Sequence, residues 1–141
     1  VQFTLDSDLR GWKIEDGGAQ GQFAINEAGN AVFSGAVAPG IDGSFSAVRH
    51  DFEPIDSSPY HAVAIGLKGD GRRYQLRVEP ARNTPQACVY DFQTSGEWET
   101  IEIPFADMLP AFPGQALVWL QIRTDDGPGP FRLEIDRIWL K

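Results

Sequence analysis

The sequence predicts one all-β domain spanning residues 1–141, built as an antiparallel sandwich or barrel. Three observations support this prediction. Fifteen glycines and ten prolines divide the 141 residues into short segments, and no segment keeps the apolar period of a helix. Within the segments, apolar and polar residues alternate as they do in half-buried strands. Turn-forming residues separate the segments at the even spacing that is typical of sandwiches and barrels.

Ten strands are expected, each bounded by turn residues. In chain order they are Trp12–Glu15, Gln22–Asn26, Ala31–Val37, Ser44–Phe52, Tyr60–Lys68, Arg72–Glu79, Ala87–Gln93, Glu97–Ile103, Ala116–Thr124 and Phe131–Leu140. The turn signals are Asp16-Gly17-Gly18, Gly29-Asn30, Pro39-Gly40, Asp42-Gly43, Gly69-Asp70-Gly71 and Asp126-Gly127-Pro128. Of these, Gly69-Asp70-Gly71 is expected to close a tight hairpin. A helical turn is expected only within residues 105–109, because Pro110 ends it.

Alternation along three strands predicts which side chains form the core. In each strand the apolar residues share one face and the polar residues share the other. The expected core positions are Leu76, Val78, Leu120, Ile122, Leu133 and Ile135. Val118 shares the phase of Leu120 and is expected on the same side. Cys88 is the only cysteine, so it is expected to be a small buried hydrophobe and to form no disulfide within the chain and no cysteine-based zinc site.

The polar faces of these strands provide the candidate binding surface. Trp119 stands on the polar face of its strand, an unusual place for an indole. If the strands are neighbours, Trp119 lies among guanidinium and amide groups. The candidate residues are Arg49, Arg73, Gln75, Arg77, Trp119, Gln121 and Arg123. The other tryptophans, Trp12, Trp98 and Trp139, are expected at sandwich edges or core ends.

Three interpretations of this surface are open. Tryptophan and arginine are enriched at protein–protein hot spots, because one supplies area and the other directional donors. The same residues could bind a sugar, with the indole stacked on the ring and the polar groups reading hydroxyls. The surface could also be an ordinary solvated sheet face with a loop folded over Trp119.

The charge balance disfavours one class of partner. Twenty acidic and 12 basic residues give a net charge of −8, and an acidic surface repels a phosphate backbone, so no nucleic-acid partner is expected. No apolar run approaches the roughly 20 residues of a membrane-spanning helix, so no transmembrane segment is expected. The chain begins with Val1 and not with Met, which we interpret as the start of a processed or excised chain.

No constellation of catalytic residues stands out, and the domain is expected not to be an enzyme. The two histidines, His50 and His61, are expected at the surface or at strand edges, and no Gly-x-Ser-x-Gly elbow accompanies them. The segment Gly69-Asp70-Gly71 lacks the Lys-Ser/Thr and the helix of a phosphate-binding loop. No cofactor and no defined metal site are expected, although acidic residues could hold a structural calcium ion. These residues are Asp6, Asp8, Asp125, Asp126, Glu134 and Asp136.

Short motifs in a fixed order carry a family resemblance. The most informative is Gly69-Asp70-Gly71-Arg72-Arg73-Tyr74. Before it stand Trp12, the glycine-rich residues 16–21, Ala31-Val32-Phe33-Ser34-Gly35 and Gly43-Ser44-Phe45-Ser46-Ala47-Val48-Arg49. After it stand Tyr90-Asp91-Phe92, Trp98-Glu99-Thr100-Ile101, Ile103-Pro104-Phe105 and Gly129-Pro130-Phe131-Arg132-Leu133. In this order the chain resembles the family of the thirty-kilodalton complex I intermediate-associated protein. It departs from the family in two loops: Gly17-Gly18-Ala19-Gln20 replaces the usual Met-Gly-Gly-x-Ser, and Asp42-Gly43-Ser44 replaces the usual Gly-Gly before the Phe.

The resemblance implies a jelly-roll β-sandwich of the galactose-binding type. It also implies a non-catalytic domain that acts by protein–protein interaction, with an assembly intermediate of a respiratory or other membrane complex as its partner. The bacterial cytoplasm or the mitochondrial matrix is the compartment that this reading favours. Many carbohydrate-binding modules use the same jelly roll, so a module excised from a larger, secreted or periplasmic protein is the alternative, with carbohydrate as its ligand. The fold alone decides neither function.

Overall fold

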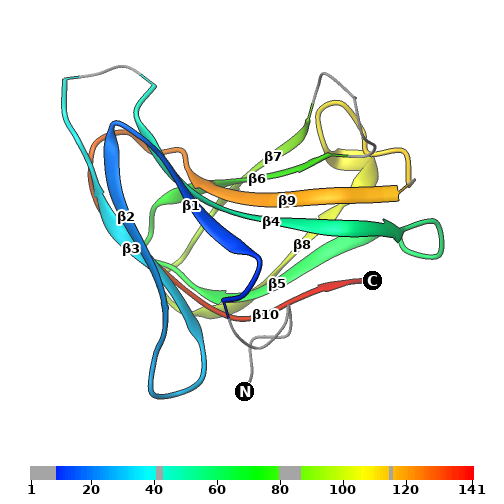
Figure 1. Cartoon of the computed structure of the whole chain (residues 1–141), viewed down its shortest axis with the longest axis horizontal. Coiled ribbons are helices and arrows are strands. Elements are labelled where there is room, and N and C mark those ends of the chain that lie inside the picture. Colours follow the sequence, from blue (N-terminus) through cyan, green and yellow to red (C-terminus); the bar gives the residue numbers. More distant parts are fainter. Residues whose placement is uncertain (1–8, 41–42, 80–86, 115) are drawn as a thin grey trace.

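Two five-stranded antiparallel sheets pack face to face in the computed structural model, which describes residues 9–40, 43–79, 87–114 and 116–141 (Figure 1). The strands are β1 (Trp12–Gly17), β2 (Ala19–Ile25), β3 (Ala31–Val37), β4 (Phe45–Asp56), β5 (Ala62–Lys68), β6 (Arg73–Glu79), β7 (Cys88–Gln93), β8 (Trp98–Pro104), β9 (Ala116–Thr124) and β10 (Gly129–Leu140). The first sheet has the order β1-β4-β9-β6-β7 and the second the order β2-β3-β10-β5-β8. The predicted all-β sandwich is confirmed. The only helix within the described ranges is the single 3₁₀ turn Phe105–Asp107.

Strand β4 is longer than the sequence predicts. The expected strand ended at Phe52, because Pro54 cannot donate to a ladder. In the structure β4 runs on to Asp56, and its pairing with β9 shifts register between Asp51 and Ile55. The shift leaves Pro54 out of the paired positions, which is the usual way a strand accommodates a proline.

The core between the sheets contains the predicted side chains. Leu76, Val78, Leu120, Ile122, Leu133 and Ile135 are all at most 1% exposed. Cys88 is buried as well, and burial raises the pKa of its thiol. One expectation at the start of β9 is wrong: Leu117 is buried, whereas Val118 is only half-buried. This reversal lies opposite the register shift in β4, where strict alternation breaks down.

The turn Gly69-Asp70-Gly71 is not a hairpin, which corrects the prediction. It connects β5 in the second sheet to β6 in the first. The Asp70 carboxylate accepts hydrogen bonds from the Tyr74 hydroxyl at 3.1 Å and from the Arg132 backbone N–H at 2.7 Å. Burial, together with the charge of Asp70, raises the pKa of Tyr74 above its ordinary value. The turn therefore fastens the two sheets together.

Arg72 extends this fastening to the loop between β9 and β10. Its guanidinium donates to four backbone carbonyl oxygens, those of Asp126 (3.0 Å), Gly127 (2.7 Å), Pro128 (3.3 Å) and Pro130 (2.8 Å). A guanidinium suits this task because its five donors diverge in a fixed plane. The Gly-Asp-Gly-Arg-Arg-Tyr segment therefore has a structural role, which explains its part in the family resemblance.

None of the helices in the described ranges is long and apolar enough to cross a membrane.

Candidate functional site

The structure brings all seven predicted binding residues to the outer face of the first sheet. They come from three adjacent strands: Arg49 from β4; Trp119, Gln121 and Arg123 from β9; and Arg73, Gln75 and Arg77 from β6. The register places Arg49, Gln121 and Arg77 side by side in one row across the sheet. Arg123 and Gln75 pair in the next row. These seven residues are called the Arg/Trp face.

The Trp119 end of the Arg/Trp face is held by ion pairs. The Arg49 guanidinium lies over the Trp119 ring, 4.5 Å from its centre. It also donates to the Asp51 carboxylate at 2.9 Å, and Lys13 approaches the other oxygen of that carboxylate at 3.2 Å. Burial alone raises the pKa of Asp51, but the hydrogen bonds from Arg49 and Lys13 outweigh it and leave the pKa below its ordinary value. The indole is therefore kept in one orientation by a fixed cation.

Amide side chains fix the middle of the Arg/Trp face. Gln121, although on the outer side, is only 8% exposed and donates to Glu15 at 2.9 Å. Arg77 donates to the Gln75 carbonyl oxygen at 2.6 Å, and the Gln75 amide in turn donates to Asp91 at 2.7 Å. The first of these contacts links β9 to β1 on the far side of β4, and the other two link β6 to β7. Groups held in this way lose little conformational entropy when a partner binds.

Arg123 is the exception to this pairing. Its guanidinium carbon lies 3.5 Å from the centre of the Phe45 ring, and it makes no hydrogen bond or ion pair with any residue of the described ranges. Burial, followed by the charge of Arg77, lowers its pKa. With Gln75, Arg77 and Asp125 it lines a hollow of about 280 Å³. The hollow therefore presents donors that the domain itself does not use.

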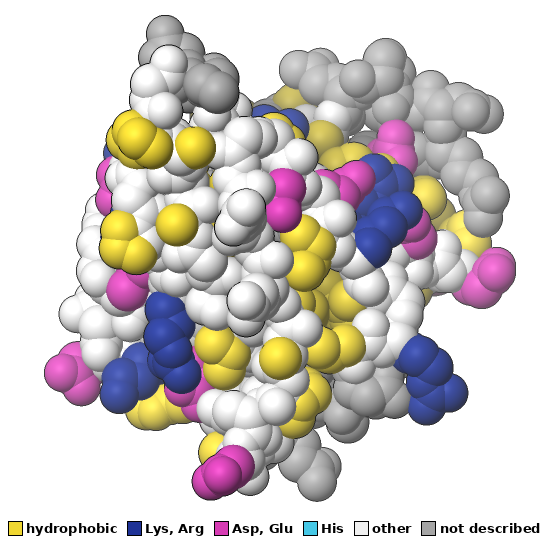
Figure 2. Space-filling model, turned by 60° about the vertical axis from the view of Figure 1, so that its left-hand side comes forward, with side chains coloured by type: hydrophobic (Ala, Val, Ile, Leu, Met, Phe, Trp, Pro, Cys, Tyr) yellow, Lys and Arg dark blue, Asp and Glu magenta, His cyan; other side chains and the backbone are white. Residues whose placement is uncertain are grey.

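Charges of both signs lie among one another on the molecular surface. On the side shown in Figure 2, Lys and Arg side chains stand singly among acidic and hydrophobic ones, without a large area of one sign. The net charge of −8 is thus not concentrated in one region of this side.

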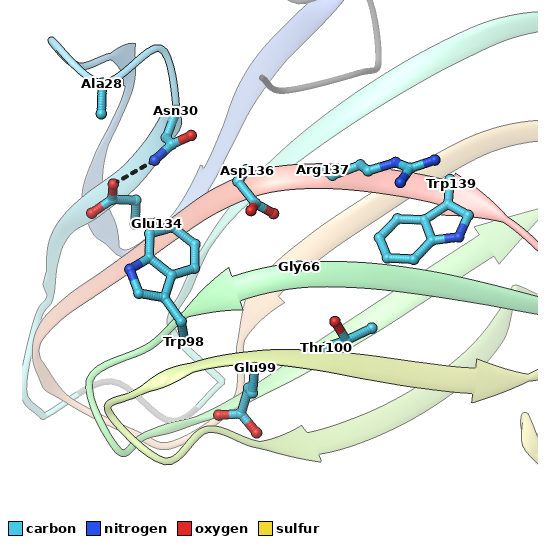
Figure 3. A pocket seen from close by; sticks show the side chains of 10 residues that line it. All are labelled: Ala28, Asn30, Gly66, Trp98, Glu99, Thr100, Glu134, Asp136, Arg137 and Trp139. Carbon is cyan, nitrogen blue, oxygen red and sulfur yellow. Dashed lines mark hydrogen bonds between the residues drawn. The ribbon is translucent and has the colours of Figure 1, made fainter. Parts of the chain in front are cut away.

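The second sheet carries a groove that the sequence did not predict. It has a volume of about 750 Å³ and is lined by Ala28, Asn30, Gly66, Trp98, Glu99, Thr100, Glu134, Asp136, Arg137 and Trp139. In Figure 3, Gly66 lies on the strand between β10, which carries Asp136 and Trp139, and β8, which carries Trp98. We call it the Trp98 groove. Trp98 is 47% exposed, and no other residue of the described ranges stacks on it.

The tryptophan expectations are partly wrong. Trp12 packs at the core edge, as expected, with its ring centre 5.3 Å from that of Phe23. Trp98 lies on the edge strand β8, also as expected, and lines the groove from there. Trp139, in contrast, lines the groove from β10, the central strand of the second sheet. His50, expected at the surface or at a strand edge, is buried beside Trp12 and Phe52. His61 is exposed, in line with the expectation.

One wall of the groove is fixed by a carboxylate. Glu134 accepts hydrogen bonds from the side-chain amides of Asn26 and Asn30, both at 2.9 Å. Burial acts to raise the pKa of Glu134, but these hydrogen bonds and nearby Arg132 prevail, so the pKa lies below the ordinary value of 4.5. Asp136 differs, since burial raises its pKa and no side chain of the described ranges donates to it.

The depressed pKa of Glu134 makes a prediction about stability and pH. A carboxyl group whose pKa is lower in the folded state stabilises that state above its unfolded pKa and loses this effect as the pH falls through the folded pKa. Glu134→Gln should therefore lower the free energy of unfolding by about 1–2 kcal/mol at neutral pH, and its difference from the parent should shrink below about pH 4.5. Urea unfolding at a series of pH values measures this difference.

The matched control for this prediction is Glu97→Gln. Glu97 is exposed, and its side chain makes no hydrogen bond within the described ranges. A difference between Glu134→Gln and the parent that stays constant from acid to neutral pH would contradict the role assigned to the Glu134 charge.

Four of the six acidic candidates for calcium lie within the described residues. Asp6 and Asp8 lie outside the described residues. Within the described ranges, no group of three or more His, Cys, Asp or Glu residues could hold a metal ion.

Comparison with solved structures shows the fold. The chain is similar to the family 11 carbohydrate-binding module of the cellulosomal cellulase Lic26A-Cel5E of Clostridium thermocellum, with a TM-score of 0.69 and 18% identity over 92% of this chain and 86% of the module. A family 11 module of the same organism in complex with a β-1,3-1,4-mixed-linked tetrasaccharide gives a TM-score of 0.67 and 18% identity, covering 93% and 88%. The family 30 module of its cellulase Cel9D-Cel44B gives 0.68 and 11%, covering 93% and 91%.

At these identities the likeness concerns the jelly-roll sandwich alone. A search of curated proteins found no match. The sequence itself matches a family, "Complex I intermediate-associated protein 30 (CIA30)", over residues 1–135. This range includes every motif on which the resemblance was based and all but the last residues of β10. The chain belongs to the CIA30 family.

Proposed function

We propose that this domain is a non-catalytic binding domain that binds a protein partner through the Arg/Trp face. The family name points to assembly intermediates of a membrane-bound respiratory complex as the class of partner. The observation that supports the proposal most strongly is the clustering of Trp119 with four guanidiniums on three adjacent strands. Residues of these two types dominate the binding energy of protein interfaces.

The form of the Arg/Trp face also favours a protein over a small ligand. Its side chains are held by ion pairs and amide hydrogen bonds, and its hollow of about 280 Å³ is at the lower end of small-molecule pockets. One side of the Trp119 ring is covered by Arg49. A broad partner surface can use such an arrangement, because many modest contacts surround a few strong ones.

Trp119→Ala should weaken partner binding by about 2 kcal/mol or more, roughly thirtyfold, if Trp119 is a hot spot. The tagged domain captures its partner from a detergent extract of membranes of the source cells, and the affinity is then measured with the purified partner. Trp98→Ala is the matched control, an indole removed from the opposite sheet. Folding should be nearly intact in both variants, since Trp119 and Trp98 both lie outside the core cluster.

A partner that binds the Trp119→Ala variant as tightly as the parent would refute the proposal. A variant that loses thermal stability while it keeps its affinity would show that Trp119 is a packing residue.

Carbohydrate binding at the same face is the second candidate function. It is favoured by the hollow at Arg123, where the donors of Arg77 and Arg123 stand beside the acceptors of Gln75 and Asp125, and the similar solved structures are carbohydrate-binding modules. A glycan array separates the two candidates: a signal that disappears in Trp119→Ala would favour carbohydrate.

A further inference from the structure

The Trp98 groove lies across three paired strands of the second sheet. Its floor is β5, which contributes Gly66, while β8 and β10 on either side contribute large side chains, those of Trp98 and Trp139 among them. At Gly66 a Cβ atom would collide with the Asp136 carboxylate, so a side chain is excluded from the middle of the floor. The groove is therefore formed by the choice of residues on three paired strands, and not by a chance gap between loops.

The groove offers an apolar platform that is not used within the domain. Trp98 is one of few large hydrophobic side chains with 40% or more of their surface exposed in the described ranges. It stands on the outward phase of β8 with Thr100 and Glu102, where the ring faces water. An exposed indole beside a concave surface is typical of a ligand site.

Polar groups of both kinds stand next to this platform. The Asp136 carboxylate accepts no hydrogen bond from other side chains of the described ranges. Asn30 is only 5% exposed, and its side-chain oxygen is buried and accepts no hydrogen bond within the described ranges. The Arg137 guanidinium lies over the Trp139 ring, 4.3 Å from its centre, and donates no hydrogen bond to the described residues. A ligand in the groove can therefore use the Asp136 carboxylate as an acceptor and the Arg137 guanidinium as a donor.

The charge of the lining restricts the ligand. Two carboxylates, those of Glu134 and Asp136, line the groove with one guanidinium, that of Arg137, whereas the Glu99 carboxylate turns away and accepts hydrogen bonds from Ser95 (Figure 3). The carboxylates repel an anionic ligand. The hydroxyl groups of a neutral ligand, in contrast, donate hydrogen bonds to carboxylates without bringing like charges together. A ligand with an apolar face and a rim of hydroxyls matches both the platform and the polar groups.

The length of the groove indicates how large the ligand is. Trp98 pairs with Lys68 of β5, and Trp139 pairs with Ala64. These two partners are four residues apart, so the tryptophans are separated by about 13 Å along the strand. One sugar ring does not span such a distance, whereas a short chain of sugars does.

We propose that the Trp98 groove is a carbohydrate-binding site for a neutral oligosaccharide, which stacks a sugar ring on Trp98 and donates hydroxyl hydrogen bonds to Asp136. Arg137 donates to ring or hydroxyl oxygens farther along the groove. This site is separate from the Arg/Trp face and does not depend on what that face binds. A polysaccharide and the glycan of a glycoprotein share this chemistry.

Isothermal titration with neutral tri- to hexasaccharides tests the proposal. One set of probes consists of fragments of neutral polysaccharides, a second of released protein glycans, and a third of uronic-acid oligosaccharides. We expect a neutral probe from the first or second set to bind, and the set it comes from identifies the source. Uronic-acid probes should bind more weakly, because the lining is acidic.

Trp98→Ala and Asp136→Asn should each weaken that binding by at least about tenfold, through loss of a stacking contact and of a charged acceptor. Tyr60→Ala removes an exposed aromatic side chain that belongs neither to the groove nor to the Arg/Trp face, so it is the matched control and should bind like the parent. Trp119→Ala is measured beside it to show whether the sugar binds the other sheet instead. Asp136→Asn keeps the size of the side chain, so it carries the test if Trp98→Ala folds poorly, as judged by circular dichroism.

Three results would overturn the proposal: no neutral oligosaccharide binds the parent, binding persists in both groove variants, or binding is lost only in Trp119→Ala. The last result would place the sugar on the Arg/Trp face. A failure of the groove variants leaves the protein-binding measurement with Trp119→Ala unaffected, so the two proposals stand or fall separately.

Discussion

Leu120→Ala is expected to lower the free energy of unfolding by about 2–5 kcal/mol, the range for large-to-small changes in packed cores. Leu120 is 1% exposed and lies on β9, the central strand of the first sheet. Removing its side-chain atoms loses their transfer free energy and leaves a cavity that flanking strands cannot fill without breaking their ladders. Urea unfolding monitored by circular dichroism measures the change.

The control for this prediction is Leu109→Ala, since Leu109 is 77% exposed and its truncation leaves no cavity. The Leu120 variant also tests the placement of Trp119. Adjacent residues on a strand point to opposite faces, so a Leu120→Ala variant that unfolds like the parent would mean that Trp119 points into the core.

Gly35→Ala is expected to cost about 1–3 kcal/mol or more, as overpacking of a closely packed region does. Gly35 has a φ of 154°, and a Cβ atom there would overlap the backbone carbonyl oxygen of Gln20 on the neighbouring strand β2. A backbone atom cannot move aside as a flexible side chain can. The β2–β3 pair would have to separate, with loss of ladder hydrogen bonds. Thermal unfolding by calorimetry measures the loss.

Gly96→Ala separates this collision from simple backbone strain. Gly96 has a φ of 87°, also unfavourable for alanine, but nothing lies within 4 Å of the added Cβ. It should therefore cost only about 1 kcal/mol. Equal losses in the two variants would contradict the close approach of Gln20 to Gly35.

The fold could be predicted because its signals are local. Alternation within a strand and glycine-rich turns between strands depend on a few neighbouring residues, and these identified ten strands and the six core positions named in advance. The extension of β4 past Pro54 could not be predicted in this way, because the bulge that accommodates the proline depends on pairing with β9. The connection between the two sheets at Gly69–Gly71 could not be predicted either, because a turn between sheets and a hairpin turn use the same types of residue.

The Arg/Trp face could be predicted in part for the same reason. Parity placed each of its residues on the outer side of a strand. These residues form one surface because β9 lies between β4 and β6. The sequence does not show which strands are neighbours, so it predicted the surface only on the condition that these strands are adjacent. The carboxylates that accept hydrogen bonds from Gln121 and Gln75, those of Glu15 and Asp91, come from β1 and β7, which parity along single strands does not connect.

The Trp98 groove was missed for two different reasons. Trp98 stands on the polar phase of β8 with Thr100 and Glu102, so the parity argument that identified Trp119 could have found it. Trp139 could not be found in this way. Its phase places it with the core residues Phe131, Leu133 and Ile135, but a bulge between Ile135 and Arg137 reverses the alternation and turns Ile138 inward instead.

The indole N–H signals of the domain give the most direct test of the Arg/Trp face. The chain has four tryptophans, and single substitutions assign their four side-chain resonances in an NMR spectrum of the ¹⁵N-labelled protein. When the captured protein partner is added, we expect the Trp119 resonance to shift or broaden and those of Trp98 and Trp139 to stay in place. An unchanged Trp119 resonance in a saturated complex, with shifts at Trp98 or Trp139, would contradict the account.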